Sequence, residues 1–476
     1  MNHSKLLFCI FCLLLLASVT NHLMAQDYSK KPNIIFVLVD DMGWGDLGFN
    51  GQKKIKTPAI DRMAREGMVM TNHYSGSTVC APSRCALLTG MTTGHGRIRG
   101  LPGWTAVKGK GTDLTSEDIT VGKELKRAGY ATAVIGKWGM AESRPLKGNP
   151  GLPLNQGFDY FYGYETHGAA HHYYPEKLWL NNDEIETGNI AVEKKGVYTP
   201  DAVTDTALNY ISRNKNNPFF LYLTYTIPHL ELTVPEESKK QYEKLGWPLR
   251  KMNFAHYYND SNGHVTYAGM ISRLDTYVQR VLDHLKSLGI EDNTLVIFAS
   301  DNGHEYDDVK KEFFNSNGPF RGHKRDLYEG GIRTPFIARW PGKITAGSKT
   351  DLQAAFWDFL PTACEIAGLK PSARIDGISY LPTLLNKPGQ QKHEYLYWET
   401  NEKMGPIQAV RKGNWKAIKF LDKPIELYDL SRDISETRNV AATNPDIVKQ
   451  MERIIATART TNESYPLRKL KKNNDE

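Results

Sequence analysis

Four short runs of β-branched and aromatic residues constrain the fold of this chain more than any other feature. They span residues 33–39, 131–135, 219–224 and 294–300. Each run is continuously apolar, which is typical of strands buried on both faces of a mostly parallel sheet. Helical patterns separate the runs: residues 265–288 carry an apolar stripe, and threonine-proline pairs at 57–58 and 199–200 predict helix starts with a capping hydroxyl. The sequence therefore predicts an α/β fold, a central mostly parallel sheet between two helical layers.

The pattern changes near residue 382. Strand-like pieces at 394–398, 408–411, 415–419 and 425–429 precede a helical stretch at 445–458. Short strands in close succession predict a small antiparallel sheet. We therefore divide the chain into a large domain, residues 26–382, and a small C-terminal α+β subdomain, residues 383–476.

Residues 1–25 have a different character. Lys5 precedes an apolar run that ends in small residues at Ala25, which is typical of a secretory signal peptide. The run is shorter than the roughly 20 apolar residues that a membrane-spanning helix needs. We expect an exported protein, periplasmic or secreted, without a stable membrane span.

Composition narrows the partners and the source of stability. The formal net charge of +7 over 476 residues comes without any basic tract, which argues against a nucleic-acid partner. Outside the predicted signal peptide only Cys80, Cys85 and Cys364 remain, too few for a disulfide scaffold. Buried apolar surface must therefore hold the fold together.

Acidic residues follow two of the predicted strands directly. Asp40 and Asp41 come after residues 33–39, and Asp301 and Asn302 come after residues 294–300. Ligands of open α/β sheets bind at the carboxyl ends of the strands, so these two pieces can meet at one cation. Such an oxygen-only set suits Ca²⁺ first and Mg²⁺ second. The alternative is that Asp40 and Asp301 are ordinary turn or cap residues.

The segment Cys80-Ala81-Pro82-Ser83-Arg84, continued by Leu88-Thr89-Gly90, fits the pattern C-x-P-S-R-x-x-x-L-T-G. It resembles the first signature of the sulfatase family, formylglycine-dependent enzymes of the alkaline-phosphatase-like superfamily. The resemblance implies an α/β/α sandwich in which residues 26–382 are catalytic. It also implies that a formylglycine-generating or anaerobic sulfatase-maturating enzyme oxidises Cys80 to formylglycine, whose hydrate attacks sulfur and contacts the metal. The alternative is a structural or metal-binding Cys80 and Cys85 pair.

Residues 129–138 resemble the second signature of that family, in which Lys137 contacts the sulfate. The family often has a histidine two residues after this lysine, where it hydrogen-bonds a formylglycine hydroxyl, and this chain has Gly139 instead. His304, close after Asp301, is our candidate to replace it.

Two further segments extend the resemblance, Pro228-His229 and residues 322–335. They imply that His229 and Lys324 contact the sulfate and the ester oxygen. A sugar alkoxide is a poor leaving group, and His229, helped by Lys324, is our candidate for the acid that protonates it. Arg84, Lys137 and Lys324 would balance the charge of the transferring group, and we expect His304 and Arg321 to contact the substrate.

The stretch 157–164 and the histidines that follow it look like those of bacterial N-acetylgalactosamine and galactose sulfatases. His171 and His172 are the expected sugar contacts. The sequence thus predicts an exported carbohydrate sulfatase, with galactose- or N-acetylgalactosamine-based sulfated glycans as its leading substrates. Two alternatives remain: a phosphodiesterase or phosphonate hydrolase of the same superfamily, and a glycan-binding relative that lost turnover, which Gly139 motivates.

Overall fold

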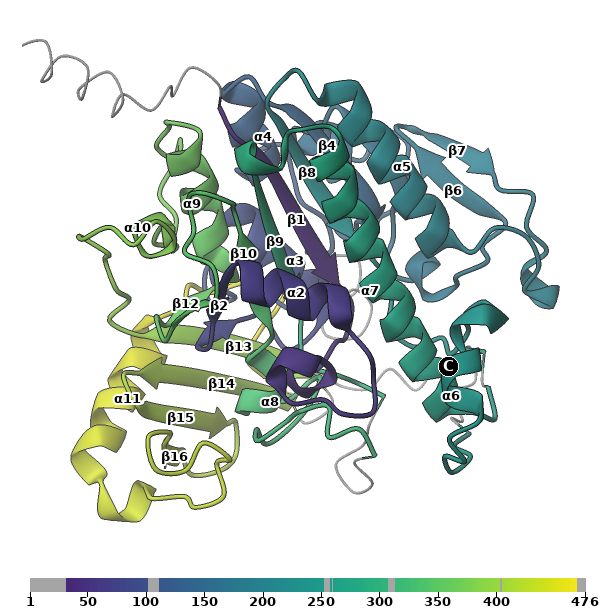
Figure 1. Ribbon diagram of the computed structural model, residues 1–476. Helices are drawn as coiled ribbons and strands as arrows, with labels where there is room; N and C mark the ends of the chain where they lie inside the picture. The colour runs from purple at the N-terminus through teal and green to yellow at the C-terminus, as the bar shows by residue number, and fades with distance from the viewer. Residues whose placement is uncertain are drawn as a thin grey trace, which may run out of the picture.

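The computed structural model describes residues 31–101, 111–251, 257–258, 260–306, 313–402 and 405–468, so the predicted signal peptide lies outside the described residues. Its largest element is a ten-stranded mixed sheet (Figure 1). The strand order is β11 (Ser348–Thr350), β2 (Met68–Met70), β10 (Phe336–Arg339), β9 (Thr294–Ser300), β1 (Asn33–Val39), β8 (Phe219–Thr224), β4 (Ala131–Lys137), β5 (Tyr160–Tyr164), β6 (Lys177–Leu180) and β7 (Asp183–Glu186).

The central strands β9, β1, β8, β4 and β5 are all parallel, and antiparallel pairs flank them on both sides. Val39 of β1 pairs with Ser300 of β9, and Leu38 pairs with Thr224 of β8. The carboxyl ends of these strands therefore lie at one edge of the sheet, as the mostly parallel arrangement predicts.

Helices cover both faces of this sheet. On one face lie α2 (Pro58–Glu66), α5 (Thr199–Asn214) and α7 (Gly263–Ser287), and on the other α3 (Cys80–Thr89), α4 (Val121–Arg127) and α9 (Phe359–Ile366). Ile34 and Phe36 of β1 enter the core under α3, α4 and α9, whereas Ile35 and Val37 enter the core under α2, α5 and α7. Because both faces are buried, β1 is apolar from Ile34 to Val39, and the buried Asn33 at its start donates a hydrogen bond to the Thr294 hydroxyl. Shorter helices are α6 (Lys240–Glu243), α8 (Glu329–Ile332) and α10 (Leu381–Leu384).

The two predicted capping hydroxyls do not cap their helices. Thr57 precedes α2, but its hydroxyl accepts from the Gly48 amide and donates to Asp61. Thr199 is the first residue of α5, and Tyr198 precedes that helix. The Thr57 hydroxyl is thus used by Gly48 and Asp61 and not by an amide of the first helical turn. Helix α5 begins one residue earlier than predicted, so Thr199 lies inside the helix and not before it.

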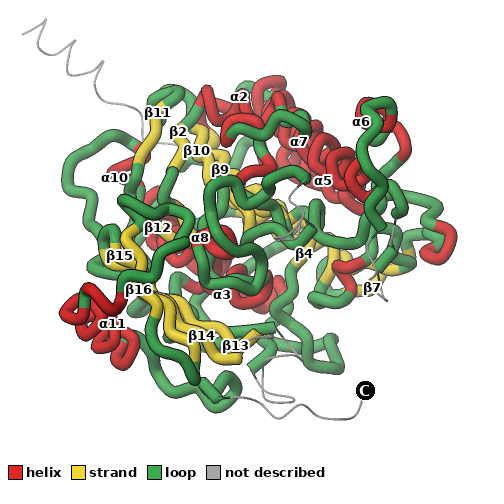
Figure 2. Tube along the Cα trace, turned by 90° about the horizontal axis from the view of Figure 1, so that it is seen from below, coloured by secondary structure: helices red, strands yellow, loops and turns green. Residues whose placement is uncertain are grey.

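A four-stranded antiparallel sheet forms the C-terminal part of the chain, as predicted. Its strands are β13 (Leu396–Glu402), β14 (Gly405–Lys412), β15 (Trp415–Phe420) and β16 (Glu426–Asp429), and α11 (Pro445–Thr457) packs on it through Met451. Trp398 on the other face packs against Tyr74 and Ala86, next to the two-stranded sheet of β3 (His73–Tyr74) and β12 (Ala354–Ala355). Seen from below in Figure 2, the β13–β14 strands run beside the large sheet, with α3 between them. Two helical layers around a mostly parallel sheet form the α/β/α sandwich that the resemblance implies, and the boundary at residue 383 stays a prediction.

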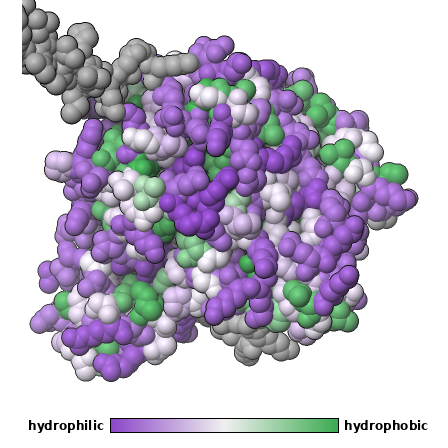
Figure 3. Space-filling view, viewed as in Figure 1, coloured by the Kyte–Doolittle hydropathy of each residue, from purple (hydrophilic) through white to green (hydrophobic). Residues whose placement is uncertain are grey.

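The face of the molecule in Figure 3 is mostly hydrophilic, and its apolar residues are scattered. In the described part of the chain, no helix combines the length and the apolar character that a membrane crossing requires.

Candidate functional site

The predicted acidic residues meet at the carboxyl edge of the sheet. Asp40 and Asp41 follow β1, Asp301 and Asn302 follow the adjacent β9, and all four are buried. The Asp41 amide donates to Asp301 Oδ1 at 3.2 Å, and Asn302 Nδ2 donates to Asp41 Oδ1 at 2.7 Å. Asp41 has a positive φ of 62°, an uncommon backbone conformation that Asp tolerates better than most residues. That conformation directs the chain out of the strand while both carboxylates stay in the site.

Three buried cations balance these carboxylates. Lys137 Nζ lies 2.6 Å from Asp40 Oδ2, and Lys324 Nζ lies 2.7 Å from Asp41 Oδ2. Arg84 donates to Asp301 Oδ2 from Nε at 3.0 Å and from Nη2 at 2.8 Å. Buried charges persist only when they are paired and hydrogen-bonded, as they are here.

These pairings fix the charge state of the site. Burial alone would raise the pKa of Asp40, but the positive charges of Lys137 and Arg84 outweigh it and hold that pKa well below its usual range. Burial lowers the pKa of Lys324, yet the carboxylates of Asp41 and Glu305 raise it well above its usual value. Asp40 is therefore ionised and Lys324 is an ammonium at neutral pH.

Cys80 is the first residue of α3 and is fully buried beside the acidic cluster. Asp40, Cys80 and Asp301 each place one oxygen or sulfur atom within 4.8 Å of the other two. Burial raises the pKa of the Cys80 thiol to about 12, so the unmodified thiol is protonated at neutral pH and is a weak nucleophile. Among the described residues, no metal-compatible cluster includes Cys85, so the structure gives no support to a Cys80 and Cys85 metal pair.

The predicted metal ligands fit a hard cation. Asp40 Oδ1 and Asn302 Oδ1 are buried and have no hydrogen-bond partner among the described residues. A buried acceptor without a partner costs free energy, and a cation between the strand ends would satisfy both oxygens. Carboxylate and amide oxygens are the ligands that Ca²⁺ and Mg²⁺ prefer.

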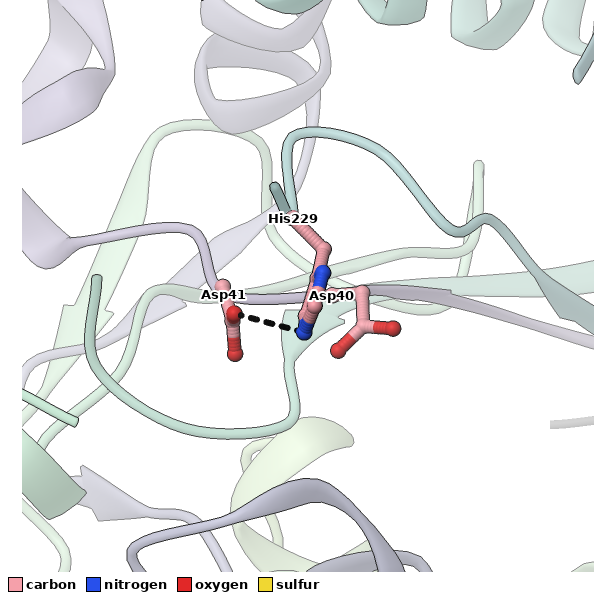
Figure 4. A group of neighbouring side chains, drawn as sticks. All are labelled: Asp40, Asp41 and His229. Atoms are coloured by element: carbon pink, nitrogen blue, oxygen red, sulfur yellow. Dashed lines mark ion pairs between the residues drawn. The ribbon is translucent and has the colours of Figure 1, made fainter. Parts of the chain in front are cut away.

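His229 joins the cluster from the loop after β8. Figure 4 shows its ring beside Asp40 and Asp41, with Nε2 3.4 Å from Asp41 Oδ2. Nδ1 faces the carbonyl of Leu230 and therefore carries a hydrogen. Burial and the charge of Lys324 lower the pKa of His229 to about 3, so its ring is neutral at pH 7.

The structure adds residues that the sequence analysis did not assign. Glu305 Oε2 lies 2.7 Å from Lys324 Nζ, and His167 Nδ1 lies 3.7 Å from Cys80 Sγ. Glu305 stands four positions after Asp301, in the same loop, which was an available signal. Nothing in the local sequence around His167 pointed to Cys80.

The two predicted sugar contacts lie at different depths. The ring of His171 stacks on His229, with centroids 5.0 Å apart and planes 15° apart, and it also contacts Tyr257. His172 is exposed, and its Nδ1 lies 2.7 Å from Oε2 of the buried Glu231. His171 thus adjoins the cluster, and His172 presents a polar group to solvent.

The other two predicted substrate residues have different surroundings. His304 is buried; its carbonyl accepts from the Lys324 amide, and its ring lies 6.0 Å from that of His323. Arg321 is exposed and donates to the Glu436 carbonyl at 2.8 Å and the Tyr428 hydroxyl at 3.2 Å. The described contacts of Arg321 therefore join the large domain to the C-terminal sheet, and its contact with substrate stays a prediction.

Comparison with known proteins places this site among hydrolases. The family model "Sulfatase" matches residues 32–369, and the model "N-sulphoglucosamine sulphohydrolase, C-terminal" matches residues 320–461. The N-acetylgalactosamine-6-sulfatase of Mus musculus is 34% identical over 416 residues, which cover 83% of this chain and 73% of that protein. The N-acetylgalactosamine-6-O-sulfatase of Bacteroides thetaiotaomicron is 29% identical over 512 residues, covering 91% and 94%. The crystal structure of Ps i-CgsB in complex with k-i-k-neocarrahexaose is 27% identical with a TM-score of 0.75, covering 92% of this chain and 95% of that one.

Proposed function

Since this chain belongs to the sulfatase family and is a sulfuric ester hydrolase, we propose that it is an exported carbohydrate sulfatase that removes 6-sulfate groups from galactose-configured sugars. The observation that carries the proposal is the burial of Cys80, Arg84, Lys137 and Lys324 around one acidic cluster. The N-acetylgalactosamine-6-sulfatases among its relatives support the sugar and the position. The signal-like residues 1–25 support export.

Asp40, Asp41, Asp301, Asn302 and residue 80 would hold the cation, with Ca²⁺ our first choice. When bound, a divalent cation polarises a sulfate oxygen and stabilises negative charge that develops on it.

Residue 80 is the proposed nucleophile after its oxidation to formylglycine by a maturating enzyme. Its hydrate supplies two hydroxyls on one carbon: one attacks sulfur, and loss of a proton from the other expels sulfate and restores the aldehyde. The protonated, buried thiol of Cys80 supports this reading, because an unmodified thiol there would be a poor nucleophile.

The surrounding cations act on the charge of the sulfuryl group. Arg84, Lys137 and Lys324 are fixed by carboxylates before substrate arrives, so their positive charge is preorganised. Lys324 also carries a proton that it can give to the leaving oxygen. The neutral ring of His229 carries its one hydrogen on Nδ1, which faces the Leu230 carbonyl, so its Nε2 has no proton to give in the ligand-free protein. We therefore propose Lys324, in place of the expected His229, as the acid that protonates the leaving oxygen.

Sugar recognition is proposed for the loop that carries His171 and His172. The His172 side chain is held by Glu231 and faces solvent, where it can donate to a sugar hydroxyl. Tyr257 and His171 offer ring faces next to His229, on which an apolar sugar face can stack.

The test is a panel of galactose, galactosamine and glucosamine substrates, each monosulfated at a single defined position. Release of inorganic sulfate is measured together with the mass of the peptide that contains residue 80. We expect turnover of a 6-sulfated galactose-configured sugar, a formylglycine mass at position 80, and no turnover by Cys80→Ala. Faster release of phosphate from matched phosphate esters would indicate the phosphodiesterase alternative. Tight binding of every sulfated sugar without turnover by fully converted protein would indicate the binding alternative.

A further inference from the structure

Gly139 leaves open space between the side chain of Lys137 and the backbone of His167. Its φ is +73°, and an added Cβ would meet Lys137 Cε at 3.9 Å and His167 Cα at 4.0 Å, which are ordinary contacts. The backbone of His167 therefore lies directly next to the missing side chain of residue 139.

Sheet pairing brings the two positions together. β4 and β5 are parallel, with Lys137 opposite Tyr164. The pairing continues past both strands, because the Trp138 amide donates to the Tyr164 carbonyl at 2.9 Å and the Gly139 amide donates to the Glu165 carbonyl at 3.1 Å. His167 thus leaves β5 at the same edge of the sheet at which Lys137 leaves β4.

The backbone and the ring of His167 each contact a neighbouring side chain. Its amide donates to Glu142 Oε1 at 2.5 Å, and its ring meets His171 edge to face with centroids 4.8 Å apart. His171 in turn stacks on His229. In this position Nδ1 lies 3.7 Å from Cys80 Sγ, and within the described part of the chain no other histidine nitrogen lies within hydrogen-bond distance of that sulfur.

We propose that His167 is a catalytic residue that accepts the proton of the residue-80 hydroxyl when sulfate leaves. The proposal rests on the formylglycine nucleophile proposed above. In this step the O–H bond of the free hydroxyl breaks and its proton passes to the imidazole. The electron pair of that bond forms the C=O bond of the aldehyde, while the bond from the same carbon to the sulfate oxygen breaks and its electron pair leaves with sulfate. The imidazolium then returns its proton to water.

The test uses matured wild type, His167→Ala and His167→Asn, each confirmed to carry formylglycine by peptide mass. Asn keeps a polar atom near the Nδ1 position and cannot take up a proton, so it separates hydrogen bonding from proton transfer. We expect both variants to release one sugar alcohol per enzyme, to retain one SO₃ group on the residue-80 peptide, and to lose about 10²- to 10⁴-fold in steady-state rate. His284→Ala, which removes a histidine between α5 and α7, should turn over as wild type.

His167→Asn keeps the proposal falsifiable if His167→Ala is poorly folded, because its side chain stays polar and closer to histidine in size. An unchanged steady-state rate in matured His167→Asn would overturn the proposal, and so would a lost rate without a sulfated peptide. An active wild type with an unmodified Cys80 would overturn both this proposal and the proposed nucleophile, whereas formylglycine in a fully active His167→Asn would overturn this one alone.

Discussion

Neutralising Asp301 should abolish the response of this protein to calcium. Asp301 is fully buried, its Oδ2 accepts two hydrogen bonds from Arg84, and its Oδ1 accepts from the Asp41 amide. Asp301→Asn preserves the shape of the side chain and removes the charge. The variant therefore tests whether this carboxylate holds a cation in addition to its ion pair with Arg84.

Two magnitudes follow from these contacts. Without the Asp301 charge, the carboxylate nearest the buried Arg84 among the described residues is Asp40 at 3.6 Å, so the free energy of unfolding should fall by about 3 kcal/mol, the lower end for a broken buried pair. In wild type, calcium at about 100 times its Kd should add about 2.7 kcal/mol. At about 2 °C per kcal/mol for a large domain, this is a rise in Tm of about 5 °C.

Thermal unfolding with and without calcium measures both effects, and it needs no maturation of Cys80. At pH 8 we expect Asp301→Asn to unfold at a lower temperature and to gain nothing from calcium. Burial and the Asp40 charge raise the pKa of Asp301 to about 6, so the calcium response of wild type should weaken as the pH falls through that value and a proton replaces the cation. Asp376→Asn, a carboxylate that binds His95 instead, should keep the full response. Equal calcium shifts in wild type and Asp301→Asn would refute the assignment of Asp301 as a ligand.

Three further predictions concern the leaving group, the pH dependence of stability and the sugar. Lys324→Met should lower kcat/KM about 10²- to 10⁴-fold for sugar sulfates and far less for 4-nitrophenyl sulfate, because the 4-nitrophenolate leaving group needs no proton. Equal losses of kcat/KM on the two substrates would contradict the role of Lys324 as proton donor. Burial raises the pKa of Glu436 from 4.5 to about 7, so between these two pH values the folded state holds a proton that the unfolded state has lost. The free energy of unfolding should therefore fall by about 3 kcal/mol as the pH rises from 4.5 to 7. Urea titrations at several pH values measure this fall, and Glu436→Gln should remove it. His172→Ala should raise KM for the sugar substrate about fivefold with kcat unchanged, the worth of one hydrogen bond of about 1 kcal/mol, and an unaltered KM would remove His172 from the sugar site.

Local patterns in the sequence predicted much of the fold. The run at 33–39 became β1 with both faces buried, and the run at 294–300 became its parallel neighbour β9. Asp40 and Asp301 could be expected to meet because each directly follows one of these runs, and adjacent parallel strands end at the same edge. The small antiparallel sheet was predictable for the same reason: short strands close in sequence pair with one another.

Tertiary structure alone decided the contacts that depend on strand order and on side-chain direction. His167 reaches Cys80 because β5 pairs with β4, and no spacing in the sequence encodes which strand lies next to which. Arg321 directly precedes the segment 322–335 that resembles a family motif, yet its guanidinium donates to the carbonyl of Glu436, more than a hundred positions away. The sequence by itself determined which residue types stand at the ends of the strands, because backbone periodicity places them there. Packing between elements decided which of those side chains contact residue 80, because a shift of one residue in the strand pairing would turn a side chain into the site or away from it.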